Sequence, residues 1–226
     1  EAAFADAPFV NDEFEQPADL PIAPEPAARA PAIPATPPAP PAAPAAAAAA
    51  TDMAPARLAE LPPSDVVLGI DLGTTYSCAA FLKDGVPEVL ALDAGYRTTP
   101  SVVTLLPNEQ IVGRAAYDRI ATHPKNTIYG SKRLLGRKYI SRAVQDAKKY
   151  FDYEIVSDEN GHAAVKIDGE IFPLVMVTSR ILEEIRHWAQ LHHKADVNQA
   201  LICVPAYYND TQRNAVIEAA QLVGFE

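Results

Sequence analysis

The stretch VVLGIDLGTTYSCAA, residues 66–80, places an acidic residue directly after an apolar run and follows it with a glycine and two threonines. The run Val66–Ile70 has the continuous apolar character of a strand that is buried on both faces. Asp71 then lies at the carboxyl end of that strand, which is the edge of an α/β sheet where ligands bind. The stretch therefore predicts a turn between two strands that carries a binding site.

The chemistry of a phosphate- and metal-binding turn is present in four residues: Asp71, Gly73, Thr74 and Thr75. A carboxylate at a strand end is costly unless a cation lies beside it, and hydrated Mg²⁺ takes one or two carboxylates together with phosphate oxygens. Gly73 allows a close backbone turn, and the threonines supply hydroxyl and N–H groups for phosphate. The turn lacks the Gly-Lys-Ser/Thr ending of a Walker A loop. From these residues alone, an ordinary hairpin corner with a capping aspartate remains an alternative.

The composition of the chain changes near residue 65. Of the 21 prolines, 15 lie in residues 1–65, whereas all ten glycines follow them. The same 65 residues hold ten acidic residues against two arginines, a formal charge of −8 out of −10 for the chain. Proline at this density excludes a helix, so we expect residues 1–64 to be a disordered, acidic and Pro/Ala-rich tail. We favour a plain spacer over a proline-rich ligand, and a solvated tail over a docking motif for FVNDEFE (9–15).

Charge, cysteine content and hydropathy exclude several classes of function. The part of the chain after residue 65 is nearly neutral, so we expect no nucleic-acid partner. Cys78 and Cys203 lie in apolar runs and are too few for a disulfide scaffold, so we expect reduced core residues in a cytoplasmic protein. No apolar stretch approaches the roughly 18 residues that span a bilayer, so no membrane segment is expected.

From residue 65 onward the pattern indicates a mixed α/β fold. Strands are predicted at 66–70, 76–82, 86–90, 101–106, 111–112 and 200–205, with a β-meander at 152–156, 163–167 and 170–172. Asp84-Gly85, between the second and third of these strands, predicts a hairpin turn. Helices are predicted at 114–123 and 141–149, in a long segment with Pro173 as its first helical residue, and in a segment that has a capping box at Asn209 and Gln212. The apolar face of the long helix is expected to hold Leu174, Val177, Ile181, Ile185 and Trp188. Residues 131–139 are expected to be a short helix or turn. The strand at 200–205 is expected to be buried, and Trp188 is expected to lie in the core.

Four motifs resemble, in order and separation, the ATPase domain of the seventy-kilodalton heat-shock chaperones, the DnaK family of the actin and sugar-kinase superfamily. They are GIDLGTTYSC (69–78), GYRTTPSVV (95–103), SKRLLGRKY (131–139) and VPAYYNDTQRNAV (204–216). The resemblance implies an actin-like, ribonuclease H-like lobe I with a mixed sheet and an inserted β-meander. We therefore expect residues 65–226 to be the truncated N-terminal lobe of a nucleotide-binding domain. The family has asparagine where this sequence has Tyr96.

The resemblance also implies a site for ATP and Mg²⁺ in the first motif. Asp71 would hold the hydration shell of Mg²⁺ through water. Thr74 and Thr75 would bind the β- and γ-phosphates, and Gly73 and Tyr76 would lie beside them.

Two basic residues of the third motif complete the implied site. Lys132 matches the family's catalytic lysine, which contacts the γ-phosphate and the attacking water. A compact, mobile ammonium group suits the stabilisation of a phosphoryl group in transfer. Arg133 would lie near the nucleotide pocket.

The fourth motif implies an allosteric role in the resembled family. Pro205 matches the switch proline, and Arg213 matches the arginine that relays the position of this proline. Tyr207, Asn209 and Asp210 fall where the family couples nucleotide state to its interdomain linker and co-chaperone. Helix capping is a second, compatible role for Asn209 and Asp210.

These residues imply an ATP-dependent stress-response chaperone whose partners are unfolded client polypeptides, a J-domain co-chaperone and a nucleotide-exchange factor. The family's second phosphate loop and its adenosine-binding glycines would lie beyond residue 226, so we expect the chain alone to bind ATP weakly or not at all and to be inactive. Two alternatives are a sugar or metabolite kinase of the same superfamily, which would lack VPAYYNDTQR, and a degenerate docking lobe that does not hydrolyse ATP.

Overall fold

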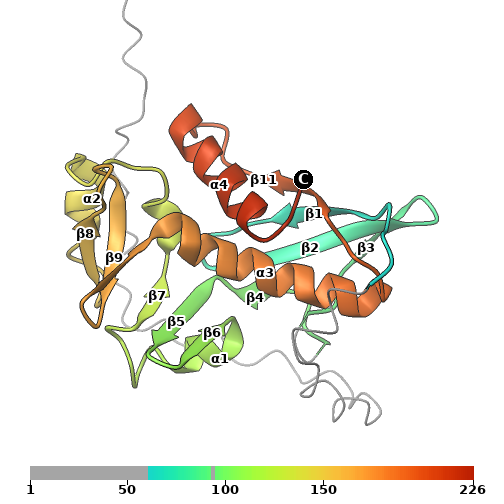
Figure 1. Ribbon diagram of the computed structural model, residues 1–226, viewed down its shortest axis with the longest axis horizontal. Helices are drawn as coiled ribbons and strands as arrows, with labels where there is room; N and C mark the ends of the chain where they lie inside the picture. The colour runs from blue at the N-terminus through green and yellow to red at the C-terminus, as the bar shows by residue number, and fades with distance from the viewer. Residues whose placement is uncertain (1–60, 93–94) are drawn as a thin grey trace, which may run out of the picture.

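The computed structural model describes residues 61–92 and 95–226 (Figure 1). The predicted disordered tail therefore lies outside the described residues, apart from its last four positions. The described chain enters the fold beside Asp196, whose backbone N–H donates a hydrogen bond of 2.7 Å to the carbonyl of Pro62.

The central sheet is mixed and has the strand order β11-β1-β2-β3, with a fifth strand, β4, paired to β2. Its strands are β1 (Val67–Asp71), β2 (Tyr76–Lys83), β3 (Val86–Val89), β4 (Thr99–Pro100) and β11 (Gln199–Cys203). The pairing of β1 with β11 is parallel, and the other pairings are antiparallel. The predicted hairpin signal Asp84-Gly85 forms the turn between β2 and β3, with φ angles of 53° and 78°.

Two three-stranded antiparallel sheets complete the β-structure. The first has the order β6-β5-β7 and comprises β5 (Val102–Leu106), β6 (Glu109–Val112) and β7 (Thr127–Tyr129). The second is the predicted meander, with β8 (Glu154–Ser157), β9 (Ala163–Ile167) and β10 (Glu170–Pro173). In Figure 1 this meander lies at the left end of the molecule beside α2 (Arg142–Ala147). The mixed α/β lobe with an inserted β-meander is therefore confirmed.

Two long helices pack against each other in front of the sheets (Figure 1). They are α3 (Leu174–His193) and α4 (Asp210–Leu222). The predicted apolar face of α3 is buried, with Leu174, Val177, Ile181 and Ile185 at most 2% exposed. The predicted capping box of α4 is also present, because the Asn209 side chain accepts a hydrogen bond of 2.9 Å from the backbone N–H of Gln212. No helix in the described part of the chain is long and apolar enough to cross a membrane.

One face of the central sheet is open, which corrects three predictions. The strand β1 alternates between exposed and buried residues instead of being buried on both faces, and β11 is an edge strand with Leu201 71% exposed. Cys203 is likewise exposed, not a core residue. The reason is that no described element covers this face, which we call the open face. Cross-strand register places on it Val67, Gly69, Asp71, Cys78, Ala80, Leu82, Val89, Leu201 and Cys203.

The helices also depart from the predictions in detail. Helix α1 (Arg114–Asp118) ends five residues before the predicted position, and the chain continues in turns, with the N–H of Ile120 donating to Tyr117 and that of Thr122 to Arg119, both at 3.1 Å. Pro173 is the residue before the first helical position of α3, because it still pairs with Ala164 as the end of β10. Trp188 is only partly buried, and its indole N–H donates to Glu184 at the surface of α3.

Candidate functional site

A pair of buried serines holds the turn between β1 and β2. The hydroxyl oxygens of Ser77 and Ser101 are 2.8 Å apart, and both side chains are buried. Ser101 donates to the carbonyl of Gly73 at 2.8 Å, while the Ser77 hydroxyl accepts from the N–H of Gly73 at 3.2 Å. The N–H of Ser101 also donates to the carbonyl of Thr75 at 2.8 Å. The loop that ends at Ser101 therefore fixes the backbone of the turn.

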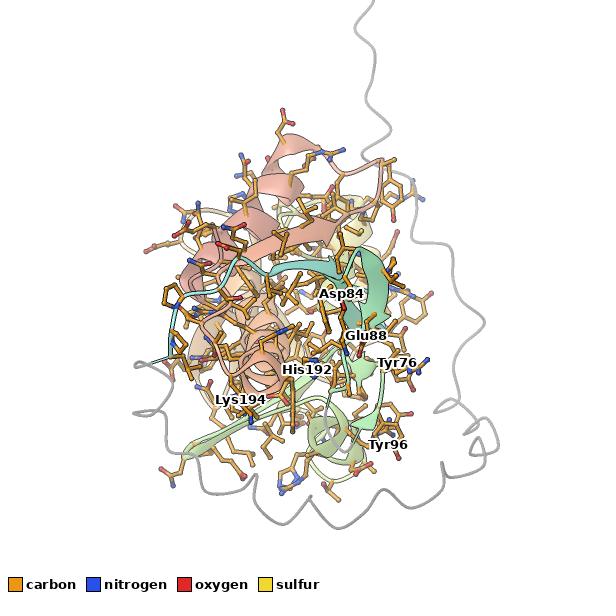
Figure 2. The ribbon with its side chains drawn as sticks, turned by 90° about the vertical axis from the view of Figure 1, so that its right-hand side faces the viewer. Tyr76, Asp84, Glu88, Tyr96, His192 and Lys194 are labelled. Carbon is orange, nitrogen blue, oxygen red and sulfur yellow. The ribbon has the colours of Figure 1, made fainter. Side chains whose placement is uncertain are left out.

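Close packing within the turn requires glycine at position 73. A Cβ atom there would lie 1.9 Å from the carbonyl oxygen of Tyr76, which is far inside van der Waals contact. The turn leaves Thr74 half-buried and Thr75 exposed. Tyr76 is 47% exposed at the start of β2, on the same side of the molecule as Tyr96 (Figure 2). The predicted phosphate-binding groups thus lie at an accessible end of the sheet.

Lys132 extends to this turn from a distant part of the sequence. It lies in a short 3₁₀-helix, η5 (Ser131–Arg133), and its ammonium group donates a hydrogen bond to the carbonyl of Leu72. Burial lowers the pKa of Lys132 below its ordinary value, while the negative charges of Asp71 and, less strongly, Cys203 oppose that shift. The fold therefore brings the carboxylate and the amine to one place at the end of β1.

Asp71 is flanked by two thiols on the open face. It is the register partner of Cys78 on β2 and of Cys203 on β11, so the three side chains form one row across three strands. Burial raises the pKa of the Cys78 thiol, and the charges of Asp71 and Cys203 add to this. The sequence did not indicate that these cysteines belong to the site, because only strand register places them there.

The third motif is joined to the fourth motif by a buried tyrosine. The hydroxyl of Tyr208, a residue only 6% exposed, donates a hydrogen bond of 2.9 Å to the carbonyl of Lys132. Gly136 lies against the start of α4, where a Cβ atom would be 2.7 Å from Cα of Gln212. Any displacement of the segment around Tyr208 therefore acts directly on the backbone that carries Lys132.

Arg213 and Pro205 hold the segment around Tyr208. The guanidinium of Arg213 donates to the carbonyl of Tyr208 at 3.0 Å and to that of Ala206 at 3.1 Å. The carbonyl of Pro205 accepts from the N–H of Tyr208 at 3.1 Å. Of the other predicted allosteric residues, Tyr207 is 63% exposed. The structure therefore brings Pro205 and Arg213 together around one short loop.

The remaining predicted residues of this region have simpler positions. Asn209 caps α4, and Asp210 is the first residue of that helix, where a carboxylate is favourable. Arg133 ends η5, and its carbonyl accepts a hydrogen bond of 2.9 Å from Arg137. Tyr96, the departure from the resembled family, has the guanidinium carbon of Arg114 4.1 Å above its ring centroid.

Tyr208 gives a prediction for the alkaline stability of the protein. Burial, with a smaller effect of Tyr207, raises the pKa of Tyr208 from 10.0 to about 12, against an opposing effect of Arg137. Below pH 10 the phenol is neutral in both the folded and the unfolded state, so the contribution of Tyr208 to the free energy of unfolding is constant there. Between pH 10 and about 12 it ionises only in the unfolded state, so the free energy of unfolding falls by at most about 1.4 kcal/mol per pH unit.

Urea unfolding from pH 8 to 12 would measure this fall. The Tyr208→Phe variant should lose stability at pH 8, through its lost hydrogen bond, and should then decline less steeply than the wild type. Tyr207→Phe is the matched control, since that ring is exposed. Parallel decline of wild type and Tyr208→Phe would contradict the prediction.

The donor set at the end of β1 suits one kind of metal ion and not another. No group of three or more His, Cys, Asp or Glu side chains in the described residues could hold a metal ion. A structural zinc site, which takes four protein ligands, therefore does not fit. A single carboxylate does fit Mg²⁺, which keeps several waters and uses phosphate oxygens as further ligands. Asp71 would hold such an ion through its water shell.

Comparison with known proteins gives one consistent result. The family model described as Hsp70 protein matches residues 67–226. Two similar curated proteins are both called mitochondrial-type heat shock protein 70. The one from Encephalitozoon cuniculi (strain GB-M1) is 39% identical over 163 residues, which is 72% of this chain. The one from Encephalitozoon hellem is 39% identical over 164 residues, or 73% of this chain. The chain spans 28% of the length of each relative.

Proposed function

Because the chain belongs to the Hsp70 family, we propose that residues 65–226 form the N-terminal lobe of the ATPase domain of a stress-response chaperone. The complete protein binds Mg²⁺-ATP and couples hydrolysis to the folding of client polypeptides. This proposal rests on the contact between Lys132 and the turn that follows Asp71: the ammonium group of Lys132 donates a hydrogen bond to the carbonyl of Leu72.

Each residue of the site has a role that its position supports. Asp71 holds the water shell of Mg²⁺, and Thr74 and Thr75 bind the β- and γ-phosphates. Gly73 allows the backbone to approach the phosphates, with Tyr76 beside them. When it is bound, the metal ion offsets phosphate charge.

The two basic residues of η5 act on the transferred phosphoryl group and on the nucleotide pocket. Lys132 contacts the γ-phosphate and the attacking water, and its lowered pKa reflects a site that already disfavours an isolated charge. An incoming polyphosphate supplies an anion that stabilises the charged form. Arg133 lies one residue further, at the border of the pocket.

We further propose that the segment Pro205–Arg213 transmits nucleotide state. Its support is the chain of hydrogen bonds from Arg213 to the carbonyl of Tyr208 and from the Tyr208 hydroxyl to the carbonyl of Lys132. Tyr207, Asn209 and Asp210 lie at the start of α4, beside this chain. The J-domain co-chaperone, the nucleotide-exchange factor and the client polypeptides are the partners of the complete protein.

The open face supports the assignment of these residues to one lobe of a larger domain. Large apolar side chains are exposed on it, with Leu201 at 71% and Leu82 at 68%. Beside the free edge of β11 lies a groove whose apolar lining residues are Ala200, Ile202, Val204, Val216, Ile217, Ala220 and Phe225. An apolar sheet face and groove of this kind are typical of surfaces covered by further structure.

The family match favours a chaperone over a sugar or metabolite kinase. A non-hydrolysing docking lobe is the outcome to expect if the complete protein fails to hydrolyse ATP. A cytoplasmic location stays a prediction, and both similar proteins are named mitochondrial-type.

Calorimetric titration of this chain with Mg²⁺-ATP tests the lobe assignment. We expect a dissociation constant well above the micromolar range and no release of phosphate, because the site offers groups to only one side of the nucleotide. The complete protein should bind and hydrolyse under the same conditions. Micromolar affinity or turnover by the chain of 226 residues would contradict the assignment of a single lobe.

A further inference from the structure

The segment around α2 is strongly basic in an acidic protein. Residues 132–149 contain seven basic residues and one acidic residue, a formal charge of +6 in a chain whose net charge is −10. The rest of the chain after residue 65, at 66–131 and 150–226, has 18 acidic and ten basic residues, a formal charge of −8. Positive charge is therefore concentrated in one short segment.

Exposed cations and exposed apolar side chains lie within residues 138–150, and we call the following five the α2 patch: Lys138, Ile140, Arg142, Lys149 and Tyr150. Arg142 and Lys149 both approach the carboxylate of Asp146, at 3.6 and 3.7 Å, with side chains 84% and 73% exposed. One carboxylate thus faces two cations. Exposed ion pairs of this kind contribute little to stability, so their cations are available to another anion.

Two exposed apolar side chains lie close to these cations in the sequence. Ile140 is 84% exposed and Tyr150 is 57% exposed, at opposite ends of α2. A surface that combines cations with exposed aliphatic and aromatic groups fits a peptide with both acidic and aromatic residues. A polyanion without apolar groups would leave Ile140 and Tyr150 uncovered.

This chain contains such a peptide outside the described residues. The stretch FVNDEFE, residues 9–15, has the acids Asp12, Glu13 and Glu15 between and beside the aromatic residues Phe9 and Phe14. We propose that residues 9–15 dock on the α2 patch of the same chain, in place of the solvated tail that the sequence alone favoured. Apart from the three cations of the α2 patch, the chain after residue 65 has 19 acidic and 14 basic residues, a formal charge of −5 that repels this stretch. The proposal does not rest on the assignment of the ATP site.

The connecting segment is long enough for this contact. Residues 16–60 separate the acidic stretch from the first described residue. A flexible chain of that length has an end-to-end distance of about 40 Å, and in the polyproline II form it spans up to about 140 Å. It can therefore pass from the start of the described chain to α2, which lies at the far left in Figure 1. Tethering supplies an effective concentration of up to about a millimolar.

Carbodiimide cross-linking of the full chain, read by mass spectrometry of the monomer band, tests the proposal. We expect amide links from Asp12, Glu13 or Glu15 to Lys138 or Lys149. The double variant Arg142→Glu/Lys149→Glu keeps Lys138 as an acceptor, and the yield of links to Lys138 should fall at least about fivefold. A salt concentration of about 0.5 M should also reduce the yield of cross-links, since it shortens the Debye length to about 4 Å.

The matched control reverses the charge of two exposed lysines outside the α2 patch, in the double variant Lys125→Glu/Lys194→Glu. Lys194 lies at the end of α3 (Figure 2). This variant should retain the wild-type cross-links. Hydrogen exchange gives a second measurement that needs no variant of the folded part: deletion of residues 1–15 should increase amide exchange within 138–150.

Three outcomes would overturn the proposal. The first is an unchanged yield in the Arg142→Glu/Lys149→Glu variant, and the second is a spread of links over all exposed lysines. The third is equal amide exchange with and without residues 1–15, together with binding of a single-stranded oligonucleotide to the patch, which would assign this surface to a nucleic acid.

Discussion

Replacement of Gly73 by alanine is expected to lower the free energy of unfolding by about 2–4 kcal/mol. The new Cβ atom would lie 1.9 Å from the carbonyl oxygen of Tyr76, which belongs to the backbone and cannot move aside as a side chain would. Relief of this overlap must open the turn and disturb the hydrogen bonds of Gly73 to Ser77 and Ser101. Urea unfolding followed by circular dichroism measures the loss.

Gly69→Ala is the matched control for this experiment. Gly69 lies four residues earlier, within β1, and a Cβ atom there would meet the carbonyl of Ala80 at 3.8 Å, an ordinary contact. Its effect should stay within about 1 kcal/mol. Equal stability of the two variants would show that the turn is not as closely packed as described.

Replacement of Lys132 by methionine should reduce ATP hydrolysis by the complete protein at least about a hundredfold, which is the scale of losing one preorganised charge in an active site. Methionine keeps most of the apolar stem and removes the charge. In this chain, the same substitution should change the free energy of unfolding by only about 1 kcal/mol, because the lost hydrogen bond to Leu72 is offset by the removal of a partly buried charge.

Lys138→Met is the control for Lys132→Met, because Lys138 is an exposed lysine six residues away whose ammonium group donates to the carbonyl of Asn160. It should leave hydrolysis unchanged. Single-turnover measurements separate chemistry from nucleotide binding and product release. A Lys132→Met protein with wild-type turnover would remove Lys132 from the reaction, while the fold assignment would stand.

Local signals in the sequence predicted the elements whose causes are local. The turn at Asp84-Gly85 needs two residues with positive φ, and both have it. The α4 capping box needs Asn209 and Gln212 three residues apart, and it forms. The apolar spacing of α3 identifies its buried face for the same reason, since helical periodicity alone decides which side chains share a face.

Predictions that depended on the environment of an element were less accurate. The apolar composition of β1 and β11 predicted burial on both faces, but burial depends on what covers a sheet, and no described element covers the open face. Helix α1 is shorter than predicted because the residues after Asp118 form turns, in which the N–H groups of Ile120 and Thr122 donate to carbonyls three residues earlier. The composition of a strand shows which environments its side chains tolerate, but it does not show which elements pack against each face.

The sequence by itself determined the chemistry of the site: a carboxylate, a glycine turn and two threonines at the end of one strand, and a lysine in a separate basic segment. Only the tertiary structure decided that Lys132 meets the carbonyl of Leu72 across 60 positions of sequence, and that Tyr208 meets Lys132 across 76. It also placed Ser77 against Ser101 beneath the turn. The physical reason is that such contacts depend on strand register and helix packing, which residue spacing along the chain does not encode.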